Sequence, residues 1–106
     1  MEYDIIMERM TFIMRGDELR RVKVRYNEYG EVMIVVDLHG MSCMEAKMVI
    51  NNIIRMYGFS FTLDLIHGSN HGTAIKKLIN QEIKNARIIR KYCNSWNPGE
   101  TFLYIQ

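Results

Sequence analysis

Apolar and polar positions follow one another along most of this chain in patterns that predict strands and helices. Residues 32–38 form a nearly continuous apolar run, and residues 61–66 form a second one. Each run leads into a His-Gly pair, at His39-Gly40 and at His67-Gly68. Short apolar runs bounded by turn residues are typical of buried β-strands, so we expect a strand at each of these two places.

The segment between the two runs predicts a helix. Ser42 and Glu45 have the spacing of a capping box, in which each side chain bonds a free backbone N–H of the first turn. Gly58 is a natural stop at the other end. The apolar side chains in between recur on one helical face: Ala46, Val49, Ile50, Ile53, Ile54 and Tyr57.

A strand, a helix and a second strand in succession favour a parallel pair joined by a crossover helix. Parallel strands end at the same edge of their sheet, where α/β proteins usually bind ligands. We therefore expect His39 and His67 to lie near each other at this edge.

The rest of the chain extends this unit. Gly72-Thr73 opens a second helix with inward-facing Ile75, Leu78, Ile79 and Ile83, and residues 88–93 and 101–105 read as strands around an Asn97-Pro98-Gly99 turn. From residue 32 the order is β-α-β-α-β-β, which predicts a two-layer α/β sandwich with a mixed sheet.

Residues 1–31 are read as an N-terminal extension, packed on or beside a domain of residues 32–106. Val22, Val24 and Tyr26 alternate with Lys23 and Arg25, as in a half-exposed strand. A turn at 27–30 would then join this strand to the run at 32–38 as a β-hairpin. Residues 1–19 fit no single period.

Composition narrows the class of protein. With 106 residues, of which 48% are hydrophobic, one folded domain is expected. Residues 1–67 carry eight Lys/Arg and ten Asp/Glu, whereas residues 68–106 carry six and two. The basic second part suits a phosphate-bearing partner, although a solvated basic face is the ordinary explanation. We read Cys43 and Cys93 as reduced thiols, and we find neither a signal peptide nor a membrane span in the sequence. These features together predict a cytoplasmic protein.

The first candidate site is the Asp37-Leu38-His39-Gly40 motif. Residues two apart on a strand share a face, so the Asp37 carboxylate can orient the His39 imidazole and raise its pKa for general acid–base work. The alternative is that both side chains merely cap the following helix.

The second candidate site is the loop from His67 to Thr73, with Gly68, Ser69, Asn70, His71 and Gly72 between them. Its small residues let backbone N–H groups approach an anion, and Lys76 and Lys77 follow on the next helix. The alternative is a loop that only turns the chain.

Small residues between His67 and His71 argue against a zinc site, so we predict no metal ligands. Tyr92, Trp96, Phe102 and Tyr104 could stack on bases, but packing within the fold is their ordinary role.

Taken together, these motifs resemble those of the Smr domain, the small MutS-related module found at the end of MutS2 proteins and as stand-alone chains. The resemblance covers about residues 32–106. The family motifs are Leu-Asp-Leu-His-Gly and His-Gly-Lys-Gly-x-Gly. Asp37 and His39 match the first motif, with Val36 in place of its leading Leu, and His67, Gly68 and Gly72 match the second. Ser69 and Asn70 replace a Lys and a Gly of the second motif, and His71 or Lys76 would have to supply the missing charge.

The resemblance implies a nucleic-acid-binding protein and an endonuclease that cleaves RNA or nicks DNA. Asp37, His39 and His67 are the expected catalytic residues. The phosphate contacts are expected from Gly40, from the backbone of residues 68–73, and from Lys76 and Lys77. No cofactor is predicted, although Mg²⁺ or Mn²⁺ is compatible with such chemistry. The alternatives are a nucleic-acid- or ribosome-binding module without catalysis, and a protein-interaction domain that uses the Met-rich N-terminal part.

Overall fold

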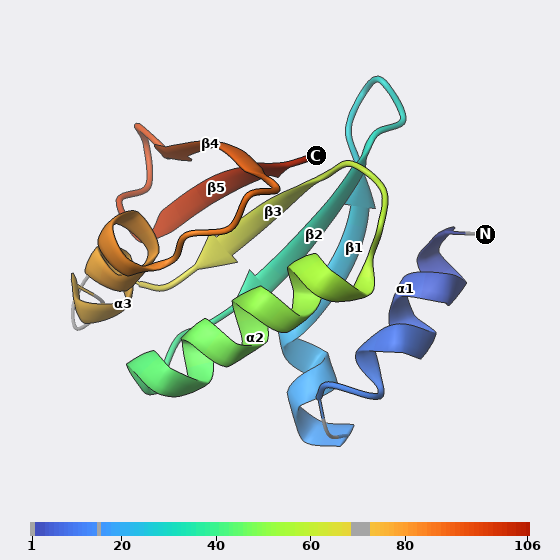
Figure 1. Ribbon diagram of the computed structural model, residues 1–106, viewed down its shortest axis with the longest axis horizontal. Coiled ribbons are helices and arrows are strands. Elements are labelled where there is room, and N and C mark those ends of the chain that lie inside the picture. The colour runs from blue at the N-terminus through green and yellow to red at the C-terminus, as the bar shows by residue number, and fades with distance from the viewer. Residues whose placement is uncertain (1, 15, 69–72) are drawn as a thin grey trace.

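The computed structural model describes residues 2–14, 16–68 and 73–106, and Figure 1 shows their arrangement. The elements in chain order are the helix α1 (Glu2–Met10), the 3₁₀ helix η1 (Gly16–Arg21), the strands β1 (Val22–Tyr26) and β2 (Val32–Asp37), the helix α2 (Cys43–Met56), β3 (Phe61–Ile66), the short helix α3 (Thr73–Lys77), the π-helical turn η2 (Leu78–Glu82), and the strands β4 (Ile88–Cys93) and β5 (Glu100–Ile105).

One five-stranded mixed sheet contains all of these strands, in the order β1-β2-β3-β5-β4. β2 and β3 pair in parallel, whereas β1–β2, β3–β5 and β4–β5 are antiparallel. The predicted β-α-β-α-β-β order from residue 32 is therefore confirmed, as is the hairpin that joins β1 to β2. The parallel pair follows from α2, whose length carries the chain back to the start of the next strand.

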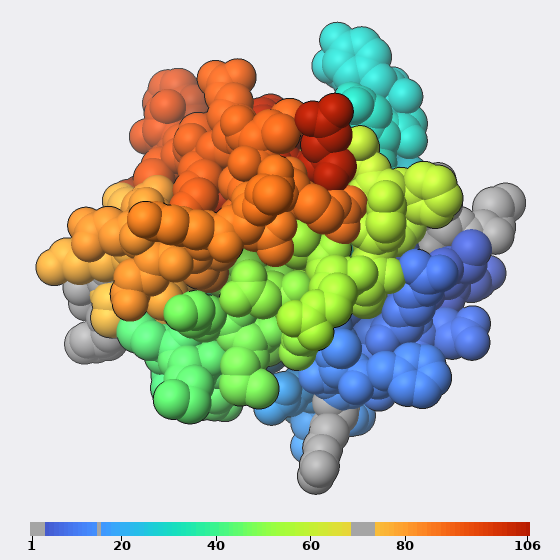
Figure 2. All heavy atoms as spheres, in the orientation of Figure 1, coloured from blue at the N-terminus to red at the C-terminus, as the bar shows by residue number. Residues whose placement is uncertain are grey.

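The helices pack on one side of the sheet and form the second layer (Figure 1). The capping box of Ser42 and Glu45 starts α2 as predicted. The core side chains of α2 and of the predicted second helix, from Ala46 to Ile83, are all buried against the inward-facing residues of β2, β3 and β5. Figure 2 shows the helix-covered side, where α2 lies between α1 and the chain after α3.

The N-terminal segment contributes to the same core. Ile6, Met10 and Met14 are buried, and the Arg9 side chain donates a hydrogen bond to the carbonyl of Met56 at the end of α2 (2.7 Å). Since the apolar residues here continue into a turn after Met10, their spacing in the sequence fits neither a helix nor a strand throughout. The boundary between an extension and the domain at residue 32 stays a prediction.

Arg87 ties three parts of the fold together. Its guanidinium donates hydrogen bonds to the carbonyls of Ile54 and Tyr57 (2.7 Å) at the end of α2, and to those of Phe59 (2.9 Å) and Gln106 (2.8 Å). The last carbonyls of a helix have no partner within the helix, and a cation at that end also interacts favourably with the helix dipole. The planar fork of arginine meets these carbonyls in directions that a lysine ammonium cannot reproduce.

We expect Arg87→Lys to lower the free energy of unfolding by about 2 kcal/mol, because hydrogen bonds to a charged group contribute about 1.5–3 kcal/mol and several are lost. Urea unfolding followed by circular dichroism measures the change. Arg55→Lys, at an exposed position of α2, is the matched control and should change the free energy of unfolding by less than about 0.5 kcal/mol. Equal stability of the two variants would show that the carbonyl contacts of Arg87 contribute little.

Candidate functional site

The ends of β2 and β3 lie side by side, as the sequence predicts, but the two histidines point to different faces. Asp37 pairs with Ile66, and the N–H of Leu38 donates to the carbonyl of Ile66 (2.7 Å). Continuing this register places Leu38 beside His67 and His39 beside Gly68. Because side chains alternate along a strand, Leu38 and His67 face the helices, whereas His39 faces the other way.

The first motif forms a tight turn that fixes the backbone of His39. The N–H of Met41 donates to the carbonyl of Leu38 (3.0 Å), and Gly40 has a φ of +84°, the conformation that a type II turn requires at its third residue. The Asp37 carboxylate accepts a hydrogen bond from the backbone N–H of His39 (2.9 Å). Asp37 thus holds the turn that carries the imidazole, and the side chain of His39 remains exposed.

Arg21 holds the same turn from the outside. Its guanidinium donates hydrogen bonds to the carbonyl of Asp37 (3.0 Å) and to that of His39 (2.6 Å). Arg21 lies in η1, outside the predicted domain of residues 32–106, and the sequence contains no motif that marks it. The N-terminal segment therefore helps to position the residue that is the strongest candidate for chemistry.

Gly68 brings the second motif against His39. A Cβ atom built on Gly68 would lie 3.4 Å from Cδ2 of the His39 ring, and the φ of Gly68 is +82°. The N–H groups of His67 and Gly68 both donate to the carbonyl of Gly99, at 2.8 and 3.1 Å. A Cβ there would make only an ordinary contact with the ring, so it is the positive φ that favours glycine at residue 68, on a backbone that is held by the β4–β5 loop.

His67 is a buried residue with both ring nitrogens engaged. It is 1% exposed, its Nδ1 lies 3.0 Å from the carbonyl of Gly68, and its Nε2 lies 2.9 Å from the hydroxyl of Thr101. A carbonyl only accepts, so Nδ1 carries the proton and Nε2 accepts from Thr101. Desolvation by burial lowers the pKa of His67, and the charge of Lys76 lowers it further. A neutral imidazole with this bonding positions the loop and offers no free nitrogen to a substrate.

The remaining predicted site residues are only partly described. Lys76 and Lys77 lie in α3, where Lys76 is half-buried and Lys77 is exposed. Thr73 begins α3, and Ser69, Asn70, His71 and Gly72 lie outside the described residues. Within residues 2–14, 16–68 and 73–106, no cluster of three or more His, Cys, Asp or Glu side chains is placed to hold a metal ion. Cys43 and Cys93 have free thiols.

Asp64 is a further unusual side chain that the sequence reading did not single out. It is 7% exposed in the middle of β3, and its Oδ1 has no hydrogen-bond partner. Desolvation by burial, together with hydrogen bonding and charge repulsion from Glu100, raises the pKa of Asp64 to about 8. The signal in the sequence is a carboxylate between Leu63 and Leu65, where an apolar strand has no ordinary need of one.

The comparison with known proteins agrees with the resemblance seen in the motifs. No protein-family model matches the chain, and no curated protein sequence does. Among solved structures, the chain is similar to the Smr domain of Thermus thermophilus MutS2, with 25% sequence identity and a TM-score of 0.59. The match covers 68% of this chain and 96% of that one. The chain therefore has the fold of an Smr domain, and the predicted resemblance is confirmed.

None of the helices within residues 2–14, 16–68 and 73–106 has the length and apolar character needed to cross a bilayer.

The bonding of His67 predicts a loss of stability at mildly acidic pH. Because its pKa is lowered in the folded state, the unfolded chain takes up the proton first as the pH falls below about 6.5. The contribution of the neutral His67 ring to stability is therefore complete above about pH 6.5 and is lost as the pH falls through the lower pKa of the folded state. Urea midpoints at about pH 7.5 and 5 should differ less for His67→Gln than for the wild type. An unchanged difference would contradict the buried neutral ring.

The raised pKa of Asp64 predicts that the free energy of unfolding falls as the pH rises, which is the opposite of the dependence expected from His67. Its pKa, raised to about 8, means that the folded protein holds this proton more tightly than the unfolded chain. The stabilisation is complete below about pH 4 and is lost as the pH rises through 8. Asp64→Asn, which imitates the protonated acid, should therefore be more stable than the wild type above pH 8, by about 1–3 kcal/mol, the cost of an unsatisfied buried group. Asp17→Asn, at an exposed position, should show no such gain.

Proposed function

We propose that this protein is a cytoplasmic nucleic-acid-binding protein that cleaves RNA with His39 as its acid–base residue. The observation that carries the proposal is the setting of His39. Its imidazole is exposed at the carboxyl edge of two parallel strands, its main chain is fixed by Asp37 and Arg21, and its ring lies against Gly68. Catalytic side chains need such positioning by groups that hold the backbone in place.

RNA is the favoured substrate because it carries its own nucleophile. His39 would take the proton of a 2′-hydroxyl, whose oxygen then attacks the adjacent phosphorus. The bond to the departing 5′-oxygen breaks, and that oxygen takes a proton from water. The products are a 2′,3′-cyclic phosphate and a 5′-hydroxyl end. DNA lacks the 2′-hydroxyl, and its hydrolysis usually calls for a water activated by a metal ion.

The other predicted residues take supporting roles in this proposal. Asp37 acts through the backbone of His39, since its observed partner is the N–H of that residue. The hydrogen bonds of His67 to Gly68 and Thr101 favour a positioning role for it over that of a second acid or base. Lys76 and Lys77, together with the N–H groups of residues 69–73, remain the predicted phosphate contacts, whereas the N–H of Gly68 already donates to the carbonyl of Gly99.

We expect the purified protein to cleave labelled single-stranded RNA in the presence of a chelator and to leave 2′,3′-cyclic phosphate ends. His39→Ala should lower the rate about 100-fold or more, the usual contribution of a general acid or base. Asp37→Asn should cost less, because an amide oxygen can still accept the hydrogen bond from the N–H of His39. Glu28→Gln, which changes an exposed carboxylate in the β1–β2 turn, is the control.

Two results would contradict this mechanism. One is cleavage confined to DNA and dependent on Mg²⁺ or Mn²⁺. The other is that the protein binds RNA but shows no cleavage that His39→Ala reduces. The protein would then be a binding module for RNA or for the ribosome. RNA affinity measured for the same variants separates loss of chemistry from loss of binding.

A further inference from the structure

The face of the sheet opposite the helices carries an ordered set of side chains. The described helices all pack on the other face (Figure 1). The strand register aligns two rows on this open face, each crossing from β1 to β4. The first row is Lys23, Val35, Asp64, Phe102 and Tyr92. The second row is Arg25, Met33, Thr62, Tyr104 and Arg90.

Three rings occupy the β4–β5 side of this face. The rings of Tyr92 and Phe102 are stacked with centroids 4.9 Å apart, and the hydroxyls of Tyr92 and Tyr104 are hydrogen-bonded at 3.0 Å. The Arg90 guanidinium lies 5.6 Å from the centre of the Tyr92 ring and 6.0 Å from that of Tyr104. The three rings are half-buried, so they support one another and still present surface to a ligand.

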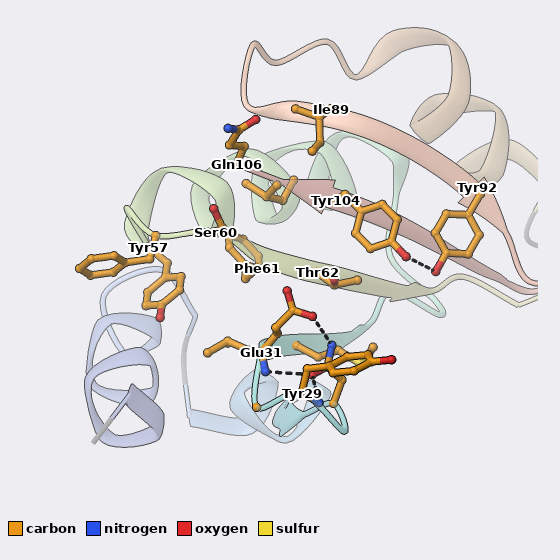
Figure 3. Close-up of a pocket in the computed structure, with 16 residues that line it drawn as sticks. Tyr29, Glu31, Tyr57, Ser60, Phe61, Thr62, Ile89, Tyr92, Tyr104 and Gln106 are labelled. Carbon is orange, nitrogen blue, oxygen red and sulfur yellow. Dashed lines mark hydrogen bonds between the residues drawn. The ribbon is translucent and has the colours of Figure 1, made fainter.

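A hollow of about 730 Å³ continues this face at the end far from His39. Figure 3 shows Tyr104, Tyr92 and Thr62 on one side of it and Tyr29 and Glu31 of the β1–β2 turn on the other. Tyr29 is 80% exposed. Aromatic side chains therefore line both the sheet and the opposite wall of the hollow, with polar groups between them.

Charge on the open face favours a polyanion. Lys23, Arg25 and Arg90 are exposed on the two edge strands. The acidic groups on the face are Asp37, Asp64 and Glu100, and Glu31 lines the adjoining hollow. Burial and the neighbouring Glu100 raise the pKa of Asp64 to about 8, which favours its uncharged form at neutral pH. Glu100 also accepts a hydrogen bond from the side chain of Asn94 (2.6 Å). The cations thus lie on the two edge strands, on either side of the aromatic rings, Met33, Val35, Thr62 and Asp64.

We propose that this open face binds single-stranded RNA, with bases stacked on Tyr92, Phe102 and Tyr104 and phosphates held by Lys23, Arg25 and Arg90. Aromatic rings accept any base by stacking, and flanking cations follow the backbone, which is the usual construction of single-strand binding surfaces. The inference rests on the proposed function, because it supplies the RNA that His39 would cleave.

The face leads directly to His39. Met33, Val35 and Asp37 alternate along β2 and share the open face, and the exposed His39 lies two residues beyond Asp37 in the turn that ends the strand. The distance from Met33 to His39 is about 20 Å at the usual rise of a strand, which is the length of a few nucleotides. A strand whose bases stack at the ring end can therefore place a later phosphodiester beside the imidazole.

The first test measures the salt dependence of binding to a fluorescent 2′-O-methyl RNA of about ten nucleotides, which lacks the 2′-hydroxyl needed for cleavage. Each phosphate contact contributes about 0.7 to the slope of log affinity against log salt concentration for single strands. Lys23→Gln and Arg25→Gln should each lower the slope by about that amount. Lys47→Gln, at an exposed position of α2 on the helix side, should leave it unchanged. Equal effects at Lys23 and Lys47 would overturn the proposal.

The second test addresses stacking. Tyr92→Leu and Phe102→Leu keep an apolar side chain but remove the ring, and each should weaken binding at least about 5-fold, because a stacked base contributes about 1–3 kcal/mol. Phe12→Leu, which removes a ring that is 84% exposed in the N-terminal segment, should have no effect. Urea unfolding confirms that the variants are folded. If Tyr92→Leu fails to fold, Phe102→Leu and the charge variants decide the test.

The outcomes separate this inference from the proposed function. Normal RNA affinity of the face variants, together with cleavage that depends on His39, would overturn the inference and leave the proposed function standing. Weakened affinity of the face variants, in a protein that does not cleave RNA, would support RNA binding by the open face and overturn the proposed chemistry.

Equal affinity for a DNA strand of the same sequence would make the face a general single-strand surface and overturn its assignment to RNA. Dimerisation that Tyr92→Leu abolishes would identify the face as an interface between copies of this chain and overturn the proposal.

Discussion

The parallel pairing of β2 with β3 is the constraint on which the candidate site depends. It brings Leu38 beside His67 and His39 beside Gly68, although these residues are 29 positions apart in each case. The pairing is maintained by α2, because its capping box begins the helix directly after the first motif and its apolar face packs on both strands. A shift of the register by one residue would exchange the inward and outward side chains of a strand, so it would bury His39 and expose its apolar neighbours. The core thus determines which histidine meets solvent.

The same alternation explains why two similar motifs have different roles. Leu63 and Leu65 are core residues of β3, and His67, two positions further on and just beyond the strand, is buried as well. Ile34 and Val36 of β2 and the next residue in this alternation, Leu38, are core residues, whereas His39 is exposed. Thr101 of β5 then meets the buried ring, which would otherwise leave an unsatisfied nitrogen inside the protein. The second histidine stabilises the place where the first one is displayed.

Much of the fold was predictable because local signals agree with the tertiary structure. The capping box, the two apolar runs and the Asn97-Pro98-Gly99 turn each specify an element on their own, and the bounds of β3 and β4 in the structure are those that the sequence predicts. The N-terminal helix was not predictable, since Ile6, Met10 and Met14 owe their burial to contacts with distant parts of the chain. The orientation of His67 was available from the alternation along β3. The role of Arg21 was not, because its partners are backbone carbonyls that no sequence pattern reveals.

Arg21 also bears on how the N-terminal segment relates to the rest of the chain. It joins η1 to the turn after β2 through the carbonyls of Asp37 and His39, and β1 adds Lys23 and Arg25 to the open face. The resemblance in sequence motifs begins only at about residue 32, yet these three cations lie before it. If the proposed chemistry and the proposed RNA surface are both correct, the part of the chain outside the motifs contributes the support of the acid–base residue and one border of the substrate path. The motifs alone would then identify the fold without accounting for how the protein holds its substrate.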